Sequence, residues 1–194
     1  MFQKLVLASH NQGKIDELSQ MLKPYGVKIL SARDLELPDV EETGKTFAEN
    51  AALKAETLSK YTGLPCLADD SGLCVDALDG RPGVYSARYA PDNDARINKL
   101  LQELQASGKK DRSAHFSCVL ALKIPQQKTK FFEGRVDGQI IEECRGNQGF
   151  GFDPVFVPEG YDCTFAEMTK EEKAKISHRG RALVQFVREV FETA

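Results

Sequence analysis

The sequence predicts an α/β fold built on a mixed β-sheet. Short apolar runs alternate along the 194 residues with segments whose apolar residues recur at helical spacing, as in chains that alternate strands with helices. Two longer strand-like segments, 114–124 and 130–141, are separated only by Pro125 and polar residues, which predicts an antiparallel pair. We find no internal repeat, low-complexity tract or linker, and a chain of this length can bury one substantial core. We therefore expect residues 1–194 to form a single α/β domain.

Each element of the N-terminal part follows from a local pattern. Ile15, Leu18 and Leu22 lie at helical spacing, and the segment from Thr46 to Glu49 has the form of a helix N-terminus, with Gly63 at the other end. The expected elements are a strand over 4–9, a helix over 11–22, a strand over 27–31, a helix from 46 to 62, a short buried strand over 65–68 that ends at Asp69, and an extended segment over 73–78.

The C-terminal part continues the alternation. The expected elements are an amphipathic helix marked by Ile97, Leu100, Leu101 and Leu104, the strand pair, a glycine-rich loop over 146–153, an apolar run over 154–157, a short basic helix opened at Thr169, and a final helix whose apolar stripe is Leu183, Phe186, Val187, Val190 and Phe191.

Composition and charge exclude several classes of protein. There are 26 basic and 29 acidic residues, a net charge of −3, and a sequence pI of about 5.7, which argues against a nucleic-acid binder that relies on bulk positive charge. No apolar run is long enough to span a membrane, and the N-terminus does not resemble a signal peptide. Five widely spaced cysteines without a CxxC pair argue against disulfides and structural zinc. We expect a cytoplasmic protein that binds neither nucleic acid nor membrane.

The segment Ser9-His10-Asn11-Gln12-Gly13-Lys14 joins the first strand to the first helix. In an open α/β sheet ligands bind at the carboxyl ends of strands, and a helix N-terminus there offers unpaired N–H groups to a phosphate. Gly13 allows a close approach of the backbone, and Lys14 supplies a positive charge. The alternative is an ordinary turn with a surface lysine.

Asp69 and Asp70 follow an apolar strand directly. At a strand end both carboxylates can reach a cleft, where their repulsion and desolvation are costly unless a cation or a hydrogen-bond donor compensates. Magnesium takes few carboxylates and fills its other positions with water and phosphate oxygens. The adjacent pair Glu41-Glu42 could supply a further ligand. The alternative is that Asp69 caps a turn and Asp70 is solvated.

Lys54 is centred on the helical face that should meet the protein interior, with Phe47, Ala51 and Leu58. A buried ammonium without a partner is costly, so we expect it to meet an anion rather than to extend to the rim.

A fourth feature combines Phe150-Gly151-Phe152-Asp153 with Lys173, His178 and Arg179. Aromatic rings on a glycine-rich loop can stack on a nucleobase, while basic side chains bind its carbonyl edge or a phosphate. The alternatives are core packing for the rings and a solvated helix face for the basic residues. Together, a phosphate loop, carboxylates, an inward lysine and a base-binding loop indicate a nucleotide hydrolase.

At this point the sequence resembles the inosine/xanthosine triphosphate pyrophosphatases, which hydrolyse non-standard purine nucleoside triphosphates. The resemblance covers nearly the whole chain, in the family's motif order. It rests on the segments SHNQGK (9–14), EETGKTFAENA (41–51), LADDSGL (67–73), PGVYSARY (82–89), GFGFDPVF (149–156) and SHRG (177–180). Many members have a small residue at position 10, and Tyr or Trp at position 152.

The resemblance implies hydrolysis of ITP, dITP and XTP to the monophosphate and pyrophosphate, dependence on Mg²⁺, a homodimer, and an elongated, twisted mixed sheet with two lobes around a central cleft. It implies that Asp70 accepts the proton of the attacking water and binds Mg²⁺ with Glu41. It also implies the following substrate contacts: Ser9, His10, Asn11, Gln12, Gly13 and Lys14 around the polyphosphate, Lys54 and Lys173 at phosphates, Ser71, and Phe150, Gly151, Phe152, Asp153, His178 and Arg179 at the base.

Two other functions remain open from the residues alone. The related septum-associated nucleotide pyrophosphatases prefer other bases, and the FGFD and SHRG motifs argue against them. A non-catalytic nucleotide-binding module is the second, and the carboxylates Glu41, Asp69 and Asp70 argue against it. A haloacid-type phosphatase is disfavoured because its DxDx[TV] motif is missing.

Overall fold

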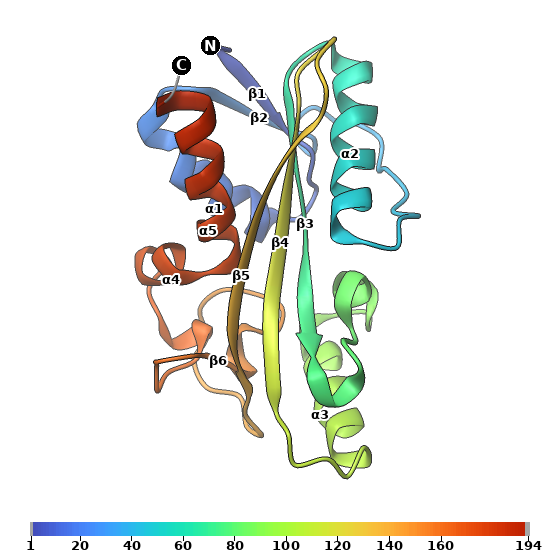
Figure 1. Cartoon of the computed structure of the whole chain (residues 1–194), viewed down its shortest axis with the longest axis vertical. Helices are drawn as coiled ribbons and strands as arrows, with labels where there is room; N and C mark the ends of the chain where they lie inside the picture. Colours follow the sequence, from blue (N-terminus) through green and yellow to red (C-terminus); the bar gives the residue numbers. More distant parts are fainter. Residues whose placement is uncertain (1, 193–194) are drawn as a thin grey trace. The chain divides into compact units, whose positions relative to one another are not determined.

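A computed structural model describes residues 2–192 and contains one six-stranded sheet in the order β2-β1-β3-β4-β5-β6 (Figure 1). The strands are β1 (Lys4–Leu7), β2 (Lys28–Ser31), β3 (Cys66–Val75), β4 (Ser113–Lys123), β5 (Lys130–Ile140) and β6 (Phe156–Pro158). β1 pairs in parallel with β2 and β3, whereas β5 pairs antiparallel with β6. The predicted α/β class with a mixed sheet is confirmed, and the two long strand-like segments are neighbours in the sheet.

The chain divides into two compact units, which we describe separately. Of the described residues, the first unit comprises 2–70, 118–134 and 179–192, and the second comprises 71–117 and 135–178. The long strands β3, β4 and β5 contribute residues to both units.

The first unit buries both faces of its part of the sheet. Helices α1 (Gln12–Leu22) and α5 (His178–Val187) lie on one side of the strands and α2 (Phe47–Thr62) on the other (Figure 1). Alternate strand residues fill two separate cores: Leu5, Leu7 and Leu67 pack with α1 and α5, while Val6, Cys66 and Ala68 pack with α2. Because strand side chains alternate between faces, the strands read as nearly continuous apolar runs, as expected for strands covered on both faces.

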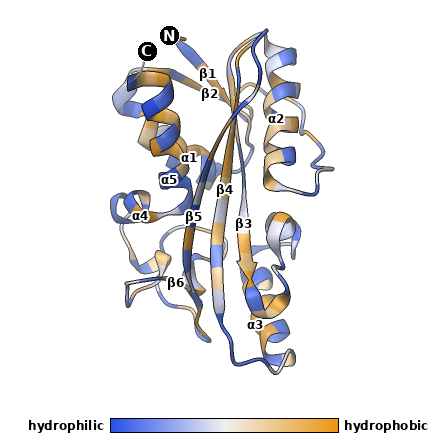
Figure 2. Cartoon of the chain, viewed as in Figure 1, coloured by the Kyte–Doolittle hydropathy of each residue, from blue (hydrophilic) through white to orange (hydrophobic). Residues whose placement is uncertain are grey.

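Helix α2 begins and ends where its sequence predicts. Thr46 Oγ1 accepts a hydrogen bond from Glu49 N at 3.2 Å, and Gly63 ends the helix with φ +69°. The Glu49 carboxylate accepts from Lys45 N at 2.6 Å, so the cap reaches one residue further back than the usual reciprocal pair. Figure 2 shows apolar and polar residues alternating along this helix. The cap thereby ties the preceding loop to the helix.

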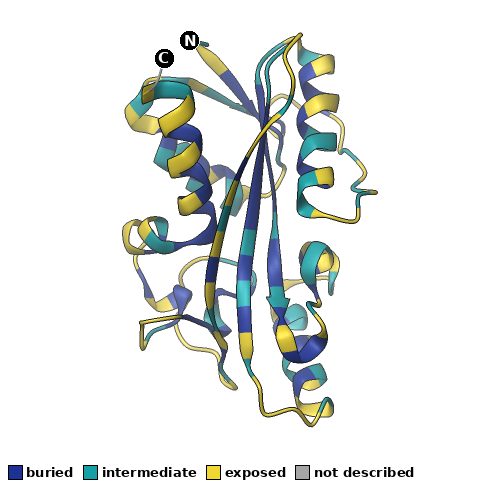
Figure 3. Cartoon of the chain, viewed as in Figure 1, coloured by how far each residue is buried: buried dark blue, intermediate teal, exposed yellow. Residues whose placement is uncertain are grey.

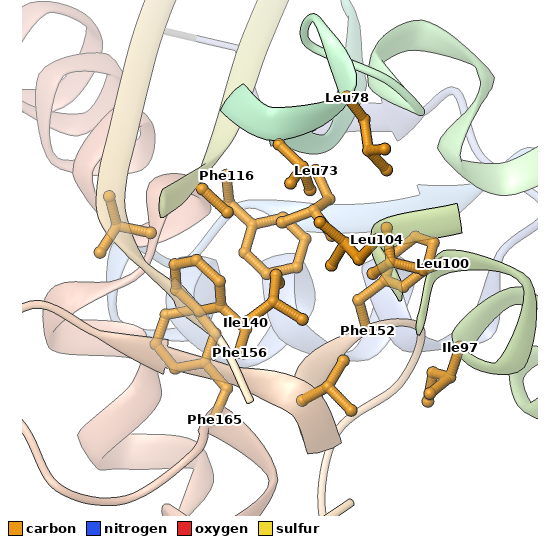
Figure 4. Close-up of a cluster of buried hydrophobic side chains, with 14 of the residues drawn as sticks. Leu73, Leu78, Ile97, Leu100, Leu104, Phe116, Ile140, Phe152, Phe156 and Phe165 are labelled. Atoms are coloured by element: carbon orange, nitrogen blue, oxygen red, sulfur yellow. The ribbon is translucent and has the colours of Figure 1, made fainter. Parts of the chain in front are cut away.

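The second unit has its own core, drawn in Figure 4. Leu73 of β3, Phe116 of β4 and Phe156 of β6 pack with Ile97 and Leu100 of α3, and all five are buried. Helix α3 (Asn93–Ala106) begins at Asp92, whose carboxylate accepts from Ala95 N at 2.8 Å. The short helix α4 (Lys170–Ile176) is capped reciprocally by Thr169 and Glu172. Both helices lie where the sequence predicts them.

Three boundaries differ clearly from the sequence prediction. The final α-helix, expected to include Val190 and Phe191, ends at Val187, and Arg188–Glu192 continue as a π-helix. β1 ends at Leu7 rather than Ser9. β3, expected to stop at Asp69, runs on through residues 69–72 to Val75. It lies between β1 and β4, so both of its edges have neighbours, and Figure 3 shows it as mostly buried. Side chains from distant segments neutralise its two aspartates, which removes the electrostatic reason for a break.

Two smaller predictions are also answered. The five cysteines are all free thiols, as their spacing predicts. Within residues 2–192 no helix is both long and apolar enough to cross a membrane.

Candidate active site

Asp69 and Asp70 lie inside β3, and both are buried. Successive side chains of a strand point to opposite faces. Asp69 therefore shares the face of Leu67, towards α1 and α5, and Asp70 shares the face of Ala68, towards α2. The expectation that both carboxylates reach one cleft at a strand end is wrong. The two carboxylates have different ion-pair partners, although Lys14 and Lys54 both donate to the Asp69 carbonyl, at 3.5 Å and 2.9 Å.

On the α2 face, Lys54 connects Asp70 to a loop carboxylate. Its Nζ lies 2.5 Å from Glu42 Oε1 and 3.4 Å from Asp70 Oδ1, and it donates to the Asp69 carbonyl at 2.9 Å. The Lys54 side chain is only 13% exposed. The prediction that an inward-facing Lys54 meets an anion is confirmed.

The Asp70 carboxylate is only partly satisfied by this lysine. Its Oδ2 is buried and has no hydrogen-bond partner among the residues that the structure describes. Burial raises the pKa of Asp70, an effect that Lys54 and Lys14 oppose without cancelling it. Burial also acts to lower the pKa of Lys54, but Asp70 and Glu42 outweigh it and raise that pKa. The Asp70 carboxylate is thereby more basic than an ordinary aspartate.

On the α1 and α5 face, Asp69 is enclosed by donors. Lys14 Nζ lies 2.5 Å from Asp69 Oδ1, and Arg179 Nε lies 2.8 Å from Oδ2. The Cys118 thiol donates to Oδ2 at 3.1 Å. Burial acts to raise the pKa of Asp69, but Arg179 and Lys14 hold it well below the usual aspartate range. Asp69 is therefore charged at neutral pH and holds Lys14 and Arg179 together.

Arg179 is buried in this cluster rather than exposed to a ligand. Its side chain is 2% exposed and also forms an ion pair with Glu17 of α1. All three guanidinium nitrogens donate hydrogen bonds to the carboxylates of Asp69 and Glu17. Its expected contact with a base stays a prediction.

The segment from Ser9 to Lys14 forms the predicted strand-to-helix junction. Asn11 caps α1 by accepting from Lys14 N at 3.2 Å, and Ser9 Oγ accepts from Asn11 N at 3.1 Å. Gln12 Nε2 donates to Asp16 at 2.7 Å, and Gly13 lies half-buried in the first turn. Hydrogen bonds of its own side chains thus stabilise this turn, which leads directly into the N-terminus of α1.

His10 has contacts of its own. Its Nε2 lies 3.0 Å from the Leu37 carbonyl, and its Nδ1 lies 3.0 Å from Asp39 Oδ1. The imidazole therefore links the junction to the loop that precedes α2.

That loop places the two adjacent glutamates differently. Glu41 is exposed, whereas Glu42 is half-buried and forms the ion pair with Lys54. The resemblance assigns the metal to Glu41, while the contact with the Asp70 cluster is made by Glu42.

In the second unit, Asp153, Lys173 and Phe150 form a compact group. Lys173 Nζ lies 2.6 Å from Asp153 Oδ2, which also accepts from Phe150 N at 2.9 Å. The ammonium lies 5.0 Å from the centre of the Phe150 ring. Gly149 has φ +72°, and a Cβ there would lie 2.0 Å from Asp153 Oδ2. The glycine-rich loop is therefore built around this carboxylate.

The remaining expected base-binding residues are more deeply placed. Phe152 is 3% exposed in the core of the second unit and meets Tyr89 edge-on, so core packing accounts for its ring. His178 is buried and stacks on Phe116 at a centroid distance of 4.7 Å. Gly151, with φ +63°, and Ser71 of β3 are half-buried.

Two residues of these clusters were not singled out from the sequence, Glu17 and Cys118, and the sequence did not distinguish Glu42 from Glu41. Glu17 follows Lys14 by three positions, so helical periodicity could have placed both on one face of α1. Glu42 lies in a loop, where no periodicity distinguishes it from Glu41. Cys118 resembles any other core residue of a buried strand.

The Asp70 cluster has the chemistry that a hard divalent cation requires. Asp70 and Glu42 share one ammonium, and a buried carboxylate oxygen is left without a hydrogen-bond partner among the described residues. A cation that uses one or two carboxylates and completes its shell with water and phosphate oxygens fits this set. Within residues 2–192, no three His, Cys, Asp or Glu residues form a group that could hold a metal by themselves.

Known proteins resemble this chain along nearly its whole length. The sequence profile of the Ham1 family matches residues 5–189. A dITP/XTP pyrophosphatase of Bacillus licheniformis is 54% identical over 184 residues, covering 93% of this chain and 94% of its own. One of Bacillus subtilis is 48% identical over 187 residues, with 94% of each covered. The solved structure of a HAM1 protein from Coxiella burnetii superposes with a TM-score of 0.90 at 43% identity, over 99% of this chain and 100% of its own.

Proposed function

The chain belongs to the Ham1 family, and we propose that it hydrolyses the non-standard purine nucleoside triphosphates ITP, dITP and XTP to the monophosphate and pyrophosphate at the Asp70 cluster. Relatives named dITP/XTP pyrophosphatase match it at 54% and 48% identity, so it is a hydrolase of triphosphate anhydrides. The observation that supports this site is the buried Oδ2 of Asp70, which has no hydrogen-bond partner among the described residues. The other oxygen of this carboxylate lies 3.4 Å from Lys54 Nζ.

The reaction is attack of water on the α-phosphorus. A bond forms between the water oxygen and phosphorus, the bond from phosphorus to the bridging oxygen breaks, and pyrophosphate leaves with the electron pair. Asp70 accepts the proton of the water as the general base. Lys54 stabilises the negative charge on the phosphates.

We assign Mg²⁺ as the cofactor, bound by Asp70 with Glu41. When bound, it neutralises phosphate charge and lowers the pKa of a coordinated water. Since Glu42 rather than Glu41 contacts Lys54, variants of both glutamates are needed to identify the second ligand.

The junction from Ser9 to Lys14 would hold the polyphosphate through the α1 N-terminus and through Lys14. Asp69 holds the Lys14 ammonium in place, because the two groups are 2.5 Å apart. The base would be held by the group of Phe150, Asp153 and Lys173, with His178 and Arg179. A 6-keto purine offers an acceptor where adenine offers a donor, and a site built on donors rejects adenine.

We also propose that the enzyme is a homodimer, as the resemblance implies. Sedimentation of the purified chain tests this part separately, because the activity argument does not depend on it.

The function is tested by measuring pyrophosphate released from ITP, XTP, dITP, GTP and ATP, with and without Mg²⁺. We expect release from the first three only, and a loss of kcat/KM of about 10²-fold or more in Asp70→Asn. Asp34→Asn, an exposed aspartate of the same unit, is the matched control. Turnover by Asp70→Asn with normal Mg²⁺ dependence would show that Asp70 is wrongly assigned. Release of phosphate instead of pyrophosphate would contradict the reaction.

A further inference from the structure

Asn50 is a buried polar residue that none of the site assignments uses. It lies in the first turns of α2 and is 0% exposed. Its Oδ1 accepts a hydrogen bond from Gly44 N at 2.8 Å. Its Nδ2 has no hydrogen-bond partner among the described residues. A side chain kept in the interior with half of its amide unsatisfied is costly, so packing alone does not explain it.

The contact of Asn50 is with the loop that carries the two glutamates. Gly44 follows Glu42 by two residues, and a Cβ on Gly44 would lie 2.7 Å from Asn50 Oδ1. The loop therefore approaches the Asn50 amide more closely than a residue with a side chain allows. Asn50 is the buried member of this contact, so it restricts the position of the loop.

A second residue on the same face of α2 also positions the loop. Lys54 follows Asn50 by four residues, so the two side chains are neighbours on α2. Lys54 contacts both Glu42 and Asp70. Asn50 therefore fixes the loop after the glutamates, and Lys54 joins one of them to Asp70. Glu41 and Glu42 depend on both for their position.

We propose that Asn50 is a positioning residue that, through Gly44, holds the Glu41–Glu42 loop at the distance from Asp70 at which these carboxylates share one divalent cation. This inference rests on the proposed function, because it assumes a cation at Asp70. Asparagine suits the position since it offers an oxygen acceptor without adding a charge beside Glu42 and Asp70. An aliphatic residue would fill the space and leave Gly44 N unbonded.

The test is a titration with Mn²⁺ in the absence of nucleotide, followed by the paramagnetic resonance signal of the free ion. We expect Asn50→Ala to raise the half-saturating Mn²⁺ concentration about tenfold or more, as loss of a residue that orients metal ligands does. The matched control is Ser59→Ala, which removes another buried side-chain bond of α2, from Ser59 Oγ to the Leu64 carbonyl at 2.9 Å. It should change the half-saturating concentration less than twofold while lowering the melting temperature similarly.

A conservative variant separates positioning from stability. Asn50→Asp keeps an oxygen acceptor for Gly44 N, so it should raise the half-saturating concentration less than Asn50→Ala does. If Asn50→Ala binds Mn²⁺ as tightly as Ser59→Ala does, the inference is wrong. Failure of the proposed function has a different signature: the wild type would release no pyrophosphate from ITP, dITP or XTP in the presence of Mg²⁺. If Asn50→Ala does not fold, Gly44→Ala decides, because its added Cβ would lie 2.7 Å from Asn50 Oδ1. Weaker Mn²⁺ binding by this variant supports the inference, and unchanged binding by the folded variant overturns it.

Discussion

Asp69 and Asp70 are adjacent in β3, yet Asp69 pairs with Lys14 of α1 and Asp70 with Lys54 of α2, on opposite faces of the sheet. Asp69 has three donors on its carboxylate, whereas Asp70 keeps a buried oxygen without a hydrogen-bond partner in the described part of the chain. The first arrangement stabilises the folded chain, and the second leaves a carboxylate available for chemistry. One dipeptide thus has two separable roles.

This separation predicts opposite effects of two matched substitutions. Asp69→Asn leaves Arg179 and Lys14 without their shared carboxylate, so the free energy of unfolding should fall by about 3 kcal/mol or more. Asp70→Asn removes a carboxylate that burial penalises, so at pH 7 the free energy of unfolding should be unchanged or raised. Urea denaturation of both variants measures this, and pyrophosphate release shows whether Asp70→Asn is inactive although folded. Equal destabilisation by the two variants would contradict the division of roles.

The pH dependence of stability should identify Asp69. Burial acts to raise its pKa, but Arg179 and Lys14 hold that pKa well below the usual range. A carboxyl whose pKa is lower in the folded than in the unfolded chain adds stability above the unfolded value. That stability is lost as the pH falls through the folded value. The difference in unfolding free energy between wild type and Asp69→Asn should therefore be constant near neutral pH and shrink below about pH 4. Urea denaturation at pH 7, 5, 4 and 3 measures this, and a difference that stays constant down to pH 3 contradicts it.

Lys54 should set the pH profile of activity. Its ammonium opposes the upward shift that burial imposes on the pKa of Asp70, so Lys54→Met should raise that pKa further. The acid limb of kcat/KM against pH should then move to higher pH, with a loss of about 10²-fold or more at neutral pH. Lys60→Met, an exposed lysine of the same helix, is the control and should leave the profile unchanged. If the acid limb does not move in Lys54→Met, the ionisation seen in the pH profile is not that of Asp70.

The sequence was most informative where periodicity governs the structure. Lys54 was placed on the inner face of α2 by helical spacing alone, and the structure has it there with Glu42 and Asp70. The capped helices and the mixed sheet were predicted on similar local grounds. The roles of these residues in binding metal and substrate stay predictions.

The errors occurred where partners come from distant segments. The run from Asp69 to Gly72 disfavours a strand locally, but Lys14, Lys54 and Arg179 neutralise its charges. None of these pairings can be inferred from spacing, because the partners lie on three different helices. Glu41 and Glu42 lie in a loop that has no periodicity. Contacts such as that of Gly44 with Asn50 set its conformation, so the sequence could not tell which glutamate faces Lys54.

Gly149 provides a test of the group around Asp153. Gly149→Ala adds a Cβ that would lie 2.0 Å from Asp153 Oδ2, so the bonds of this carboxylate to Lys173 and Phe150 N must shift. Gly160→Ala is the matched control, because Gly160 has φ +82° with nothing within 4 Å of an added Cβ. The control should cost about 1–2 kcal/mol, the strain of a left-handed residue. Gly149→Ala should cost more and also raise KM for ITP, and equal effects on both measurements would contradict the arrangement.

Arg179 is the residue at which structure and resemblance compete. Its guanidinium bonds to Asp69 and Glu17, whereas the resemblance assigns it to the base. If it also donates to a 6-keto group, Arg179→Ala should lower the ratio of kcat/KM for ITP over ATP about tenfold or more, since a bond from a charged donor contributes about 1.5–3 kcal/mol. The matched control is Leu183→Ala, a buried residue of α5, which should destabilise the fold by about 2–5 kcal/mol and leave the ratio unchanged. An unchanged ratio in Arg179→Ala would assign Arg179 to the Asp69 cluster alone, and recognition of the base would then rest on the group of Phe150, Asp153 and Lys173.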